Sequence, residues 1–293
     1  SQSVFRDVYV ALTIAALETR SARLGPQVTN PVSRHPVVTA SAISSVDEVS
    51  GGRAVLGLGS GDSALYTVGA PPSTLAGLED ALLTLRALLS GQPVHKNGHT
   101  WHVRRARRPV PLYLAAEGPR TLRLAGRLAD GVVVGLGLTP DLIKLALQHL
   151  AEGAAEGGRA LEDLDTWWLV KANLGPIDDI KMAVAASANH TFRFTFEGKG
   201  LPENLWQPIR ELHAAYRAHD HEVRDGANAT ITDRLGLTQY LAERFAFWGE
   251  PDDVRRRIER AATAGARQFL LTGFVREPLR FIDRWGSEVN ARI

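Results

Sequence analysis

The stretch VTNPVSRHPVVTASAISSVDEVSGGRAVLGLGSGD, residues 28–62, contains the repeating unit of this chain. It reads as a strand end, a turn, a helix, a second turn and a second strand. The residue before a proline is pushed out of the helical region, so the first strand must end at Asn30. Gly51 and Gly52 end the helix, because glycine adopts the left-handed conformation of a helix C-cap. The largely apolar residues 53–58 then predict a strand that is buried on both faces of a parallel sheet.

A glycine-rich loop follows that strand, with Gly57, Gly59 and Gly61 at alternating positions. Glycine has no Cβ, so a phosphate or a flat ring can approach the backbone N–H groups closely. In parallel α/β folds, ligands bind beyond the C-terminal ends of the strands. A tight turn would need the same glycines, so the loop by itself leaves both interpretations open.

The same strand-then-helix unit recurs along the chain, which indicates an α/β fold with a parallel sheet. Asn97-Gly98 lies between two short β-forming runs and predicts a hairpin at residues 92–103. Ser73 is expected to cap a helix at residues 74–89. Six buried strands are predicted, and they begin near Arg23, Arg53, Pro111, Val132, Thr166 and Gln268.

Residues 189–247 do not follow this rhythm. They favour helix, and they contain four histidine residues and Trp206. Long insertions between strand-helix units tend to be functional, so we expect this one to cover the mouth of the fold and shape a substrate pocket. We predict a single domain over residues 1–293, with the insertion as part of it.

The composition excludes several classes of protein. The 293 residues are 44% hydrophobic and 23% charged, which is typical of a globular protein with a large core. A net charge of +2 is too small to indicate nucleic-acid or membrane-surface binding. The chain has no cysteine, no apolar run long enough to span a membrane and no recognisable signal peptide, so we predict a cytoplasmic location. His219 and His221 are spaced like a metal pair, but exposed histidines near each other are common, and we predict no metal.

Several motifs together resemble the bacterial-luciferase-like oxidoreductases. They are VTNPVSRHP at residues 28–36, DEVSGGR at 47–53, LGLGSGDSAL at 56–65, AAEGPR at 115–120, LAGRLADG at 124–131 and GEPDDV at 249–254. The sequence is most similar to the branch of methylenetetrahydromethanopterin reductase and related deazaflavin enzymes. The resemblance implies a TIM (β/α)8 barrel of the luciferase-like type with a helical insertion.

Such a barrel begins with a strand, a helix and a second strand, whereas this sequence opens on a predicted helix at residues 8–19. We therefore expect an N-terminal β-α-β segment of about forty residues to be missing from this sequence. A closed barrel needs eight strands, and six are predicted here. The two strands of that segment would complete the barrel.

The resemblance also assigns cofactor-binding residues at two strand ends. A non-proline cis peptide is implied at Gln27-Val28, against the ring of a flavin or deazaflavin, with Thr29 and Asn30 beside it. Gly59 and Gly61 would line the same cofactor. The family commonly has glycine at the position of Gln27.

The loop after the third predicted strand would hold the cofactor phosphate through Ala116, Gly118 and Pro119, where a helix begins and its free N–H groups attract anions. An ordinary turn is the alternative for this loop. Glu117 would be repelled by a phosphate, so we expect it to face the substrate or the ring. Gly135 and Gly137, after the next strand, either line the ring or form a plain turn.

The function implied is hydride transfer between coenzyme F420, a deazaflavin, and a small organic substrate with a C=N, C=O or C=C bond. Asp62 and Glu117 are the candidates for the catalytic acid, because a carboxyl group in a partly apolar pocket can hold a proton. One alternative is an FMN-dependent monooxygenase that uses dioxygen, and another is a non-catalytic ligand-binding barrel subunit. The resemblance implies a homodimer, and no motif identifies the substrate.

Overall fold

A computed structural model describes residues 6–61, 63–66, 68–104, 106, 108–221, 223–224 and 226–293. The chain forms two compact units. Unit 1 comprises Ser1–Ala115, Arg123–Val132 and Ala151–Asp165, and unit 2 comprises Ala116–Leu122, Val133–Leu150 and Thr166–Ile293. Five elements continue along the chain from one unit into the other, namely β4 (Leu112–Ala116), α5 (Pro119–Leu128), β5 (Gly131–Val134), α6 (Pro140–Glu156) and β6 (Asp165–Ala172).

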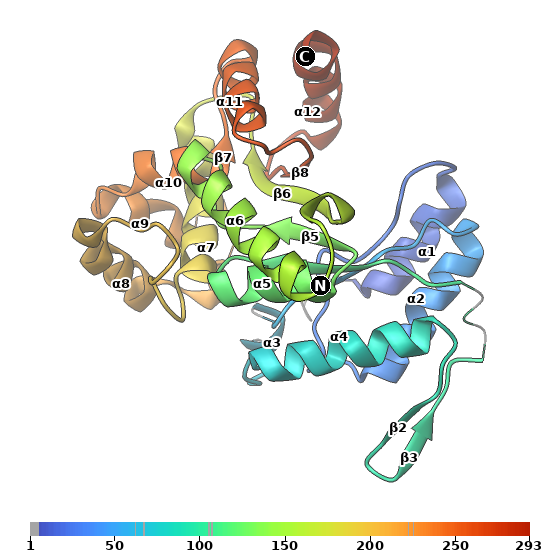
Figure 1. The fold of residues 1–293 in the computed structure, drawn as a ribbon. Helices are drawn as coiled ribbons and strands as arrows, with labels where there is room; N and C mark the ends of the chain where they lie inside the picture. Colours follow the sequence, from blue (N-terminus) through green and yellow to red (C-terminus); the bar gives the residue numbers. More distant parts are fainter. Residues whose placement is uncertain are drawn as a thin grey trace. The chain divides into compact units, whose positions relative to one another are not determined.

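Unit 1 also contains four helices and three further strands within its described residues. They are α1 (Val8–Glu18), α2 (Pro36–Ser50), β1 (Leu56–Leu58), α3 (Ser63–Tyr66), α4 (Leu75–Leu89), β2 (Val94–Lys96) and β3 (His99–Trp101). The predicted hairpin is present as β2 and β3, which extend beyond α4 (Figure 1). Asn97 and Gly98 both have positive φ, 52° and 74°, as a two-residue hairpin turn requires.

The parallel pairing in unit 1 joins β1 to β4, with Leu56 opposite Leu112 and Leu58 opposite Leu114. The strand predicted at residues 23–29 forms only two isolated bridges to the β1 segment, at Leu24 and Thr29. Pro26 lies between these bridges and has no N–H to donate, so a continuous ladder cannot form there. The β-forming run was therefore correctly located, but its pairing is interrupted.

The helix ends in unit 1 follow local signals, with one correction. Gly51 caps α2 in the left-handed conformation, at φ 71°, as predicted. Ser73 was expected to cap α4, but Thr74 is the N-cap residue, and its Oγ1 accepts a hydrogen bond from the Gly77 N–H at 3.1 Å. Ser73 directs its hydroxyl to the Thr74 carbonyl instead.

In unit 2, β6 pairs in parallel with both β7 (Ala246–Phe247) and β8 (Phe269–Thr272). Strand β7 was missed, because two residues at the end of the predicted insertion carry no periodic signal. The last helices, α11 (Pro251–Thr263) and α12 (Pro278–Arg284), lie side by side (Figure 1). A π-helical turn at Trp285–Val289 continues α12 and packs against α11.

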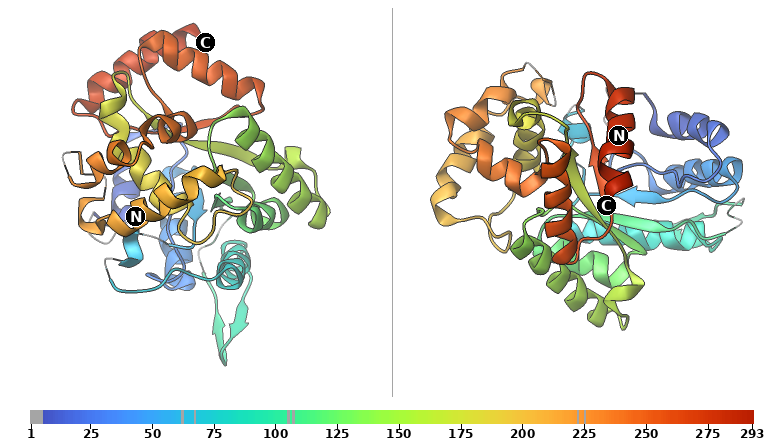
Figure 2. Two further views of the ribbon diagram at one scale, coloured as in Figure 1. Left: turned by 90° about the vertical axis from the view of Figure 1, so that its left-hand side faces the viewer. Right: turned by 90° about the horizontal axis from the view of Figure 1, so that it is seen from above.

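The insertion is largely helical and has an apolar core of its own. A 3-10 turn at Ile177–Ile180 and α7 (Lys181–Thr191) lead into it, and its own helices are α8 (Trp206–Ala215), α9 (Asn228–Arg234) and α10 (Thr238–Phe245). These four helices pack together (Figure 2). The fully buried side chains of Val184, Phe192, Ile209, Leu212 and Leu241 lie at the centre of this core. None of the helices in the described part of the chain is long and apolar enough to cross a membrane.

Candidate active site

In unit 1, the structure brings two predicted loops together at the C-terminal end of β1. The Thr29 N–H donates to the Gly57 carbonyl, and the Gly59 N–H donates to the Thr29 carbonyl, both at 2.9 Å. The peptide bond Gln27-Val28 is cis, as the resemblance implies. Residues 27–30 and 57–61 therefore form one continuous corner of unit 1.

The glycines of this corner let two segments pack closely. A Cβ on Gly57 would lie 2.3 Å from the Pro26 carbonyl oxygen, and one on Gly59 would lie 2.8 Å from Cγ2 of Val28. Gly61 has a φ of +94°, which side chains with a Cβ rarely adopt. The glycines therefore make a tight turn and leave space for the Pro26 carbonyl and the Val28 side chain, and the approach of a ligand to this loop stays a prediction.

Asn30 and His35 have structural roles beside this corner. The Asn30 side-chain oxygen is buried and accepts hydrogen bonds from the N–H groups of Val32 and Ser33, at 3.0 and 2.8 Å. His35 is the N-cap residue of α2, and its Nδ1 accepts from the Val37 N–H at 3.3 Å. Asp62, a predicted catalytic residue, lies outside the described residues.

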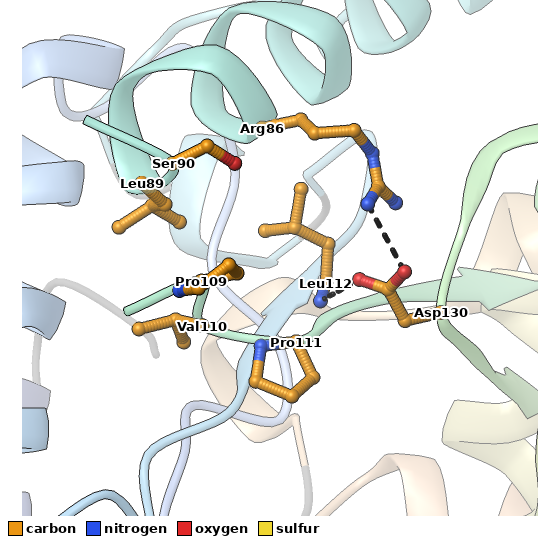
Figure 3. A pocket seen from close by; sticks show the side chains of 8 residues that line it. All are labelled: Arg86, Leu89, Ser90, Pro109, Val110, Pro111, Leu112 and Asp130. Carbon is orange, nitrogen blue, oxygen red and sulfur yellow. Dashed lines mark hydrogen bonds and ion pairs between the residues drawn. The ribbon is translucent and has the colours of Figure 1, made fainter. Parts of the chain in front are cut away.

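A cavity of about 160 Å³ in unit 1 has none of the predicted site residues in its lining (Figure 3). It borders Leu112, the first residue of β4, and Asp130, which precedes β5, so it is at the N-terminal ends of these strands. Asp130 accepts from Arg86 at 3.0 Å and from the Leu112 N–H at 2.8 Å. In βα-barrels, the N-terminal face contributes stability, and the C-terminal face carries the chemistry.

In unit 2, the carboxylate of Glu117 lies close to a histidine ring of the insertion. Its Oε1 lies 3.3 Å from Nε2 of His190, in the last turn of α7. The Gly135 N–H donates to the Ala116 carbonyl at 3.0 Å, and a Cβ on Gly135 would lie 2.6 Å from the Glu117 Oε1. Gly135 thus leaves the space that the carboxylate occupies.

The predicted phosphate loop is closed on itself at Gly118. The Gly118 N–H donates to Oγ1 of Thr121 at 3.2 Å. Pro119 has no N–H. The donors that remain in this loop are therefore the N–H groups of the first turn of α5. A buried cation lies beside the loop, because a Cβ on Gly118 would be 3.1 Å from Cε of Lys199.

Sequence reasoning missed Lys199, which is only 6% exposed. Its ammonium group donates to the Thr191 carbonyl. Burial lowers the pKa of Lys199, the nearby Arg244 lowers it further, and the charge of Glu117 opposes both effects. A lysine within a polar insertion gives no sequence signal that it will be buried.

Arg244 was also missed, and it is 1% exposed. Its guanidinium donates to the carbonyls of Leu136, Lys199 and Gly200 and to the hydroxyl of Tyr240. It also lies over the Phe192 ring, 4.7 Å from the centroid. Burial lowers the pKa of Arg244, while Glu117 and Tyr240 favour its charged form. This side chain holds the loop after β5 and the loop before α8 in place.

The other histidines of the insertion differ in environment. His213 Nδ1 lies 2.9 Å from the Asn189 side-chain oxygen, and burial lowers the pKa of this histidine. The side chain of His219 is 99% exposed and contacts Asp220.

The sequence model of the luciferase-like monooxygenase family matches residues 1–268. A 5,10-methylenetetrahydromethanopterin reductase from Archaeoglobus fulgidus is 33% identical over 276 residues, which cover 90% of this chain and 80% of that protein. An F420-dependent glucose-6-phosphate dehydrogenase from Beutenbergia cavernae is 30% identical, over 96% of this chain and 81% of that protein.

Among solved structures, the coenzyme F420 dependent tetrahydromethanopterin reductase from Methanopyrus kandleri is similar, with a TM-score of 0.74 and 26% identity. The alignment covers 100% of this chain and 89% of that structure. The predicted α/β barrel fold of the luciferase-like type is thereby confirmed.

Proposed function

The chain belongs to the luciferase-like monooxygenase family, and from that premise we propose that it is an F420-dependent oxidoreductase. In this proposal it transfers a hydride between the deazaflavin and a C=N, C=O or C=C bond of a small organic molecule. Two of the relatives, the glucose-6-phosphate dehydrogenase and the reductase of known structure, are named as F420-dependent, which supports this cofactor over FMN.

The corner at the end of β1 is the observation that carries the proposal. Residues 27–30 and 57–61 contain no charged side chain, and the cis peptide Gln27-Val28 packs against the glycines at the end of β1. An uncharged corner of this kind fits a flat, largely apolar ring. We assign Gln27, Val28, Thr29 and Asn30 with Gly59 and Gly61 to the ring. When bound, the reduced ring would supply the hydride.

We assign Ala116, Gly118 and Pro119 to the phosphorylated tail of the cofactor. The first turn of α5 presents N–H groups to an anion, and the buried ammonium of Lys199 adds positive charge beside Gly118. A phosphate fits this donor set. Equilibrium dialysis with F420 tests the assignment, because a G118V variant should bind the cofactor more weakly and a G286A variant, where nothing lies within 4 Å of the new Cβ, should not.

Glu117 and Asp62 remain the proposed acidic residues of the reaction. Glu117 lies against His190 and Gly135, which supports the expectation that it serves the reaction rather than the phosphate. Single-turnover rates of the E117A and D62A variants test this role. A variant that transfers hydride at the wild-type rate would remove its residue from the mechanism.

For the substrate, we propose a one-carbon adduct of a reduced pterin. The support is the 33% identity to a methylenetetrahydromethanopterin reductase over 90% of the chain. Glucose 6-phosphate is the second substrate to test, because a relative of 30% identity is named for it.

The deciding experiment begins with protein made in a host that contains both F420 and FMN. We expect the ligand released from it to have the deazaflavin spectrum, and we expect anaerobic oxidation of reduced F420 on addition of the methylene pterin. Bound FMN with uptake of dioxygen would instead indicate the monooxygenase. Failure to bind either cofactor would indicate a non-catalytic barrel.

We also propose that the chain forms a homodimer in the cytoplasm. The apolar side chains of Val10, Ile14 and Leu17 are exposed on one face of α1, which supports a protein contact there. Analytical ultracentrifugation tests the dimer, and an I14E variant should weaken it. Cell fractionation tests the location.

A further inference from the structure

His213 lies at the contact between α7 and α8. It is in the last turn of α8, which packs against both α7 and α9. Its ring atom Nδ1 lies 2.9 Å from the side-chain oxygen of Asn189, in the last turn of α7. Because an amide oxygen can only accept a hydrogen bond, Nδ1 carries the hydrogen atom of the neutral ring. This hydrogen bond joins the two helices close to the point where the chain leaves α7.

The other ring nitrogen of His213 is buried in a place where a proton would be costly. No hydrogen-bond partner of Nε2 is found among the described residues. In the neutral ring, Nε2 is only an acceptor. Protonation would place an N–H group and a positive charge there, and a buried charge without a partner costs far more than a buried acceptor. The geometry therefore favours the neutral ring.

The charged groups near His213 also oppose its protonation. Arg193 and Lys199, from the loop that follows α7, act on the ring, and both are basic. α7 faces the ring with the uncharged amide of Asn189, and within the described residues no acidic group of α9 or of the turn before α8 acts on it. Burial is the largest cause that lowers the pKa of His213 below the ordinary 6.5, and the backbone of Phe192 opposes this shift only in part.

The contact between α7 and α8 is continuous with the hydrogen bonds of the buried cations in unit 2. The carbonyl of Thr191, two residues after Asn189, accepts a hydrogen bond from the ammonium group of Lys199. The carbonyls of Lys199 and Gly200 accept in turn from the guanidinium of Arg244. These hydrogen bonds hold the chain between α7 and α8, so a change at the contact alters how that segment packs.

We propose that His213 makes the insertion sensitive to acid, because its protonation separates α8 from α7 and opens the insertion locally. Above pH 6.5 the ring is neutral whether the contact is closed or open, so the contact has its full stability. Below that pH, the opened form takes up a proton that the closed form does not, so the closed form loses stability as the pH falls. This loss continues until the ring in the closed form is itself protonated.

NMR tests the protonation of His213 directly. The imidazole resonances of isotope-labelled histidine are followed as a function of pH, and His213 is identified by the signal that an H213Q variant lacks. We expect this ring to titrate below 6.5. An N189D variant places a carboxylate beside Nδ1 and should raise the pKa of His213, because an opposite charge favours the protonated ring. A wild-type ring that titrates at 6.5 or above would overturn the proposal.

Hydrogen exchange followed by mass spectrometry tests the opening, after correction for the intrinsic effect of pH on exchange. From about pH 6.5 to about pH 5, we expect the protection factors of amides in α7 and α8 to fall by up to about tenfold per pH unit. H213Q keeps a donor for Asn189 but takes up no proton, so it should lack this loss. H219Q is the matched control, because the His219 side chain is 99% exposed, and it should behave like the wild type.

An equal loss of protection in acid by the wild type and H213Q would overturn the proposal. If H213Q does not fold, N189D decides the question, because its carboxylate should preserve protection in α7 and α8 at about pH 5. A loss in N189D as large as that of the wild type would then overturn the proposal. Neither measurement uses F420 or a substrate, so the outcome is independent of the proposed function.

Discussion

The two loops that contain predicted site residues, one in each unit, are built in different ways. The corner at the end of β1 consists of backbone and small side chains, and its partners are residues close in sequence or on the neighbouring segment. The loop after β4 is surrounded by charged side chains, and these come from the insertion, more than seventy positions further along the chain at His190 and more than eighty at Lys199.

This difference shows what each loop needs in order to form. The β1 corner depends on the absence of Cβ atoms at Gly57 and Gly59, so it is sensitive to added volume. The β4 loop depends on the insertion folding around Lys199 and Arg244, so it is sensitive to loss of buried hydrogen bonds. Four measurements follow from this contrast.

Loss of Arg244 should have the largest effect on stability. In an R244M variant, the buried carbonyls of Leu136 and Lys199 lose their donor, and each unsatisfied group costs about 1–3 kcal/mol. We expect a loss of about 3 kcal/mol or more in the free energy of unfolding, measured with urea. An R244K variant keeps the positive charge but loses the several N–H donors of the guanidinium, so it should recover only part of the lost stability. A loss below about 1 kcal/mol would contradict the role of Arg244.

Added volume at Gly57 should have the next largest effect. In G57A, the new Cβ would meet the Pro26 carbonyl oxygen at 2.3 Å, and backbone cannot move aside as a flexible side chain can. Overpacking of this kind typically costs about 1–3 kcal/mol, measured by urea unfolding. G286A is the control, since nothing lies within 4 Å of a Cβ there. Equal stabilities of the two variants would show that the corner tolerates volume.

The corrected helix cap of α4 should have a smaller effect. T74A removes the acceptor of the Gly77 N–H and should cost about 1 kcal/mol. S73A is the matched control and should cost less, because Ser73 does not accept from the helix. Thermal unfolding of both variants measures the difference, and the reverse order of stability would restore Ser73 as the cap.

Replacement of Lys199 should have the smallest effect, a change in how the free energy of unfolding depends on pH. Burial lowers its pKa in the folded state below the ordinary 10.5, so the unfolded chain binds more protons between the two values. Stability attributable to this residue should therefore rise with pH from the lowered pKa up to about 10.5. Urea unfolding of wild type and K199M at a series of pH values measures it. If the free energy of unfolding of the wild type minus that of K199M stays constant or falls as pH rises, the lowered pKa of Lys199 would be contradicted.

Local sequence signals predicted most elements of the fold. Gly51 as a C-cap, the Asn97-Gly98 hairpin and the strands β4 and β5 each follow from a short run of residues. The exceptions have local causes as well: Pro26 interrupts the first ladder, and β7 is too short to show periodicity. The single-domain organisation stays a prediction.

The candidate site was predictable only where backbone conformation defines it. Asn30 before a proline and glycines after a buried strand can be recognised in the sequence, because both restrict the chain locally. The resemblance supplied the cis peptide at Gln27-Val28 and the interest in Glu117. It did not supply His190, Lys199 or Arg244 as neighbours of Glu117.

The sequence by itself determined the order of strands and helices and the positions of the turns, because these depend on interactions a few residues apart. Only the tertiary structure decided that an acidic side chain after β4 would face a histidine, a lysine and an arginine from the insertion. Such contacts depend on how distant segments pack, and packing buries charges at positions that look like ordinary surface residues in the sequence.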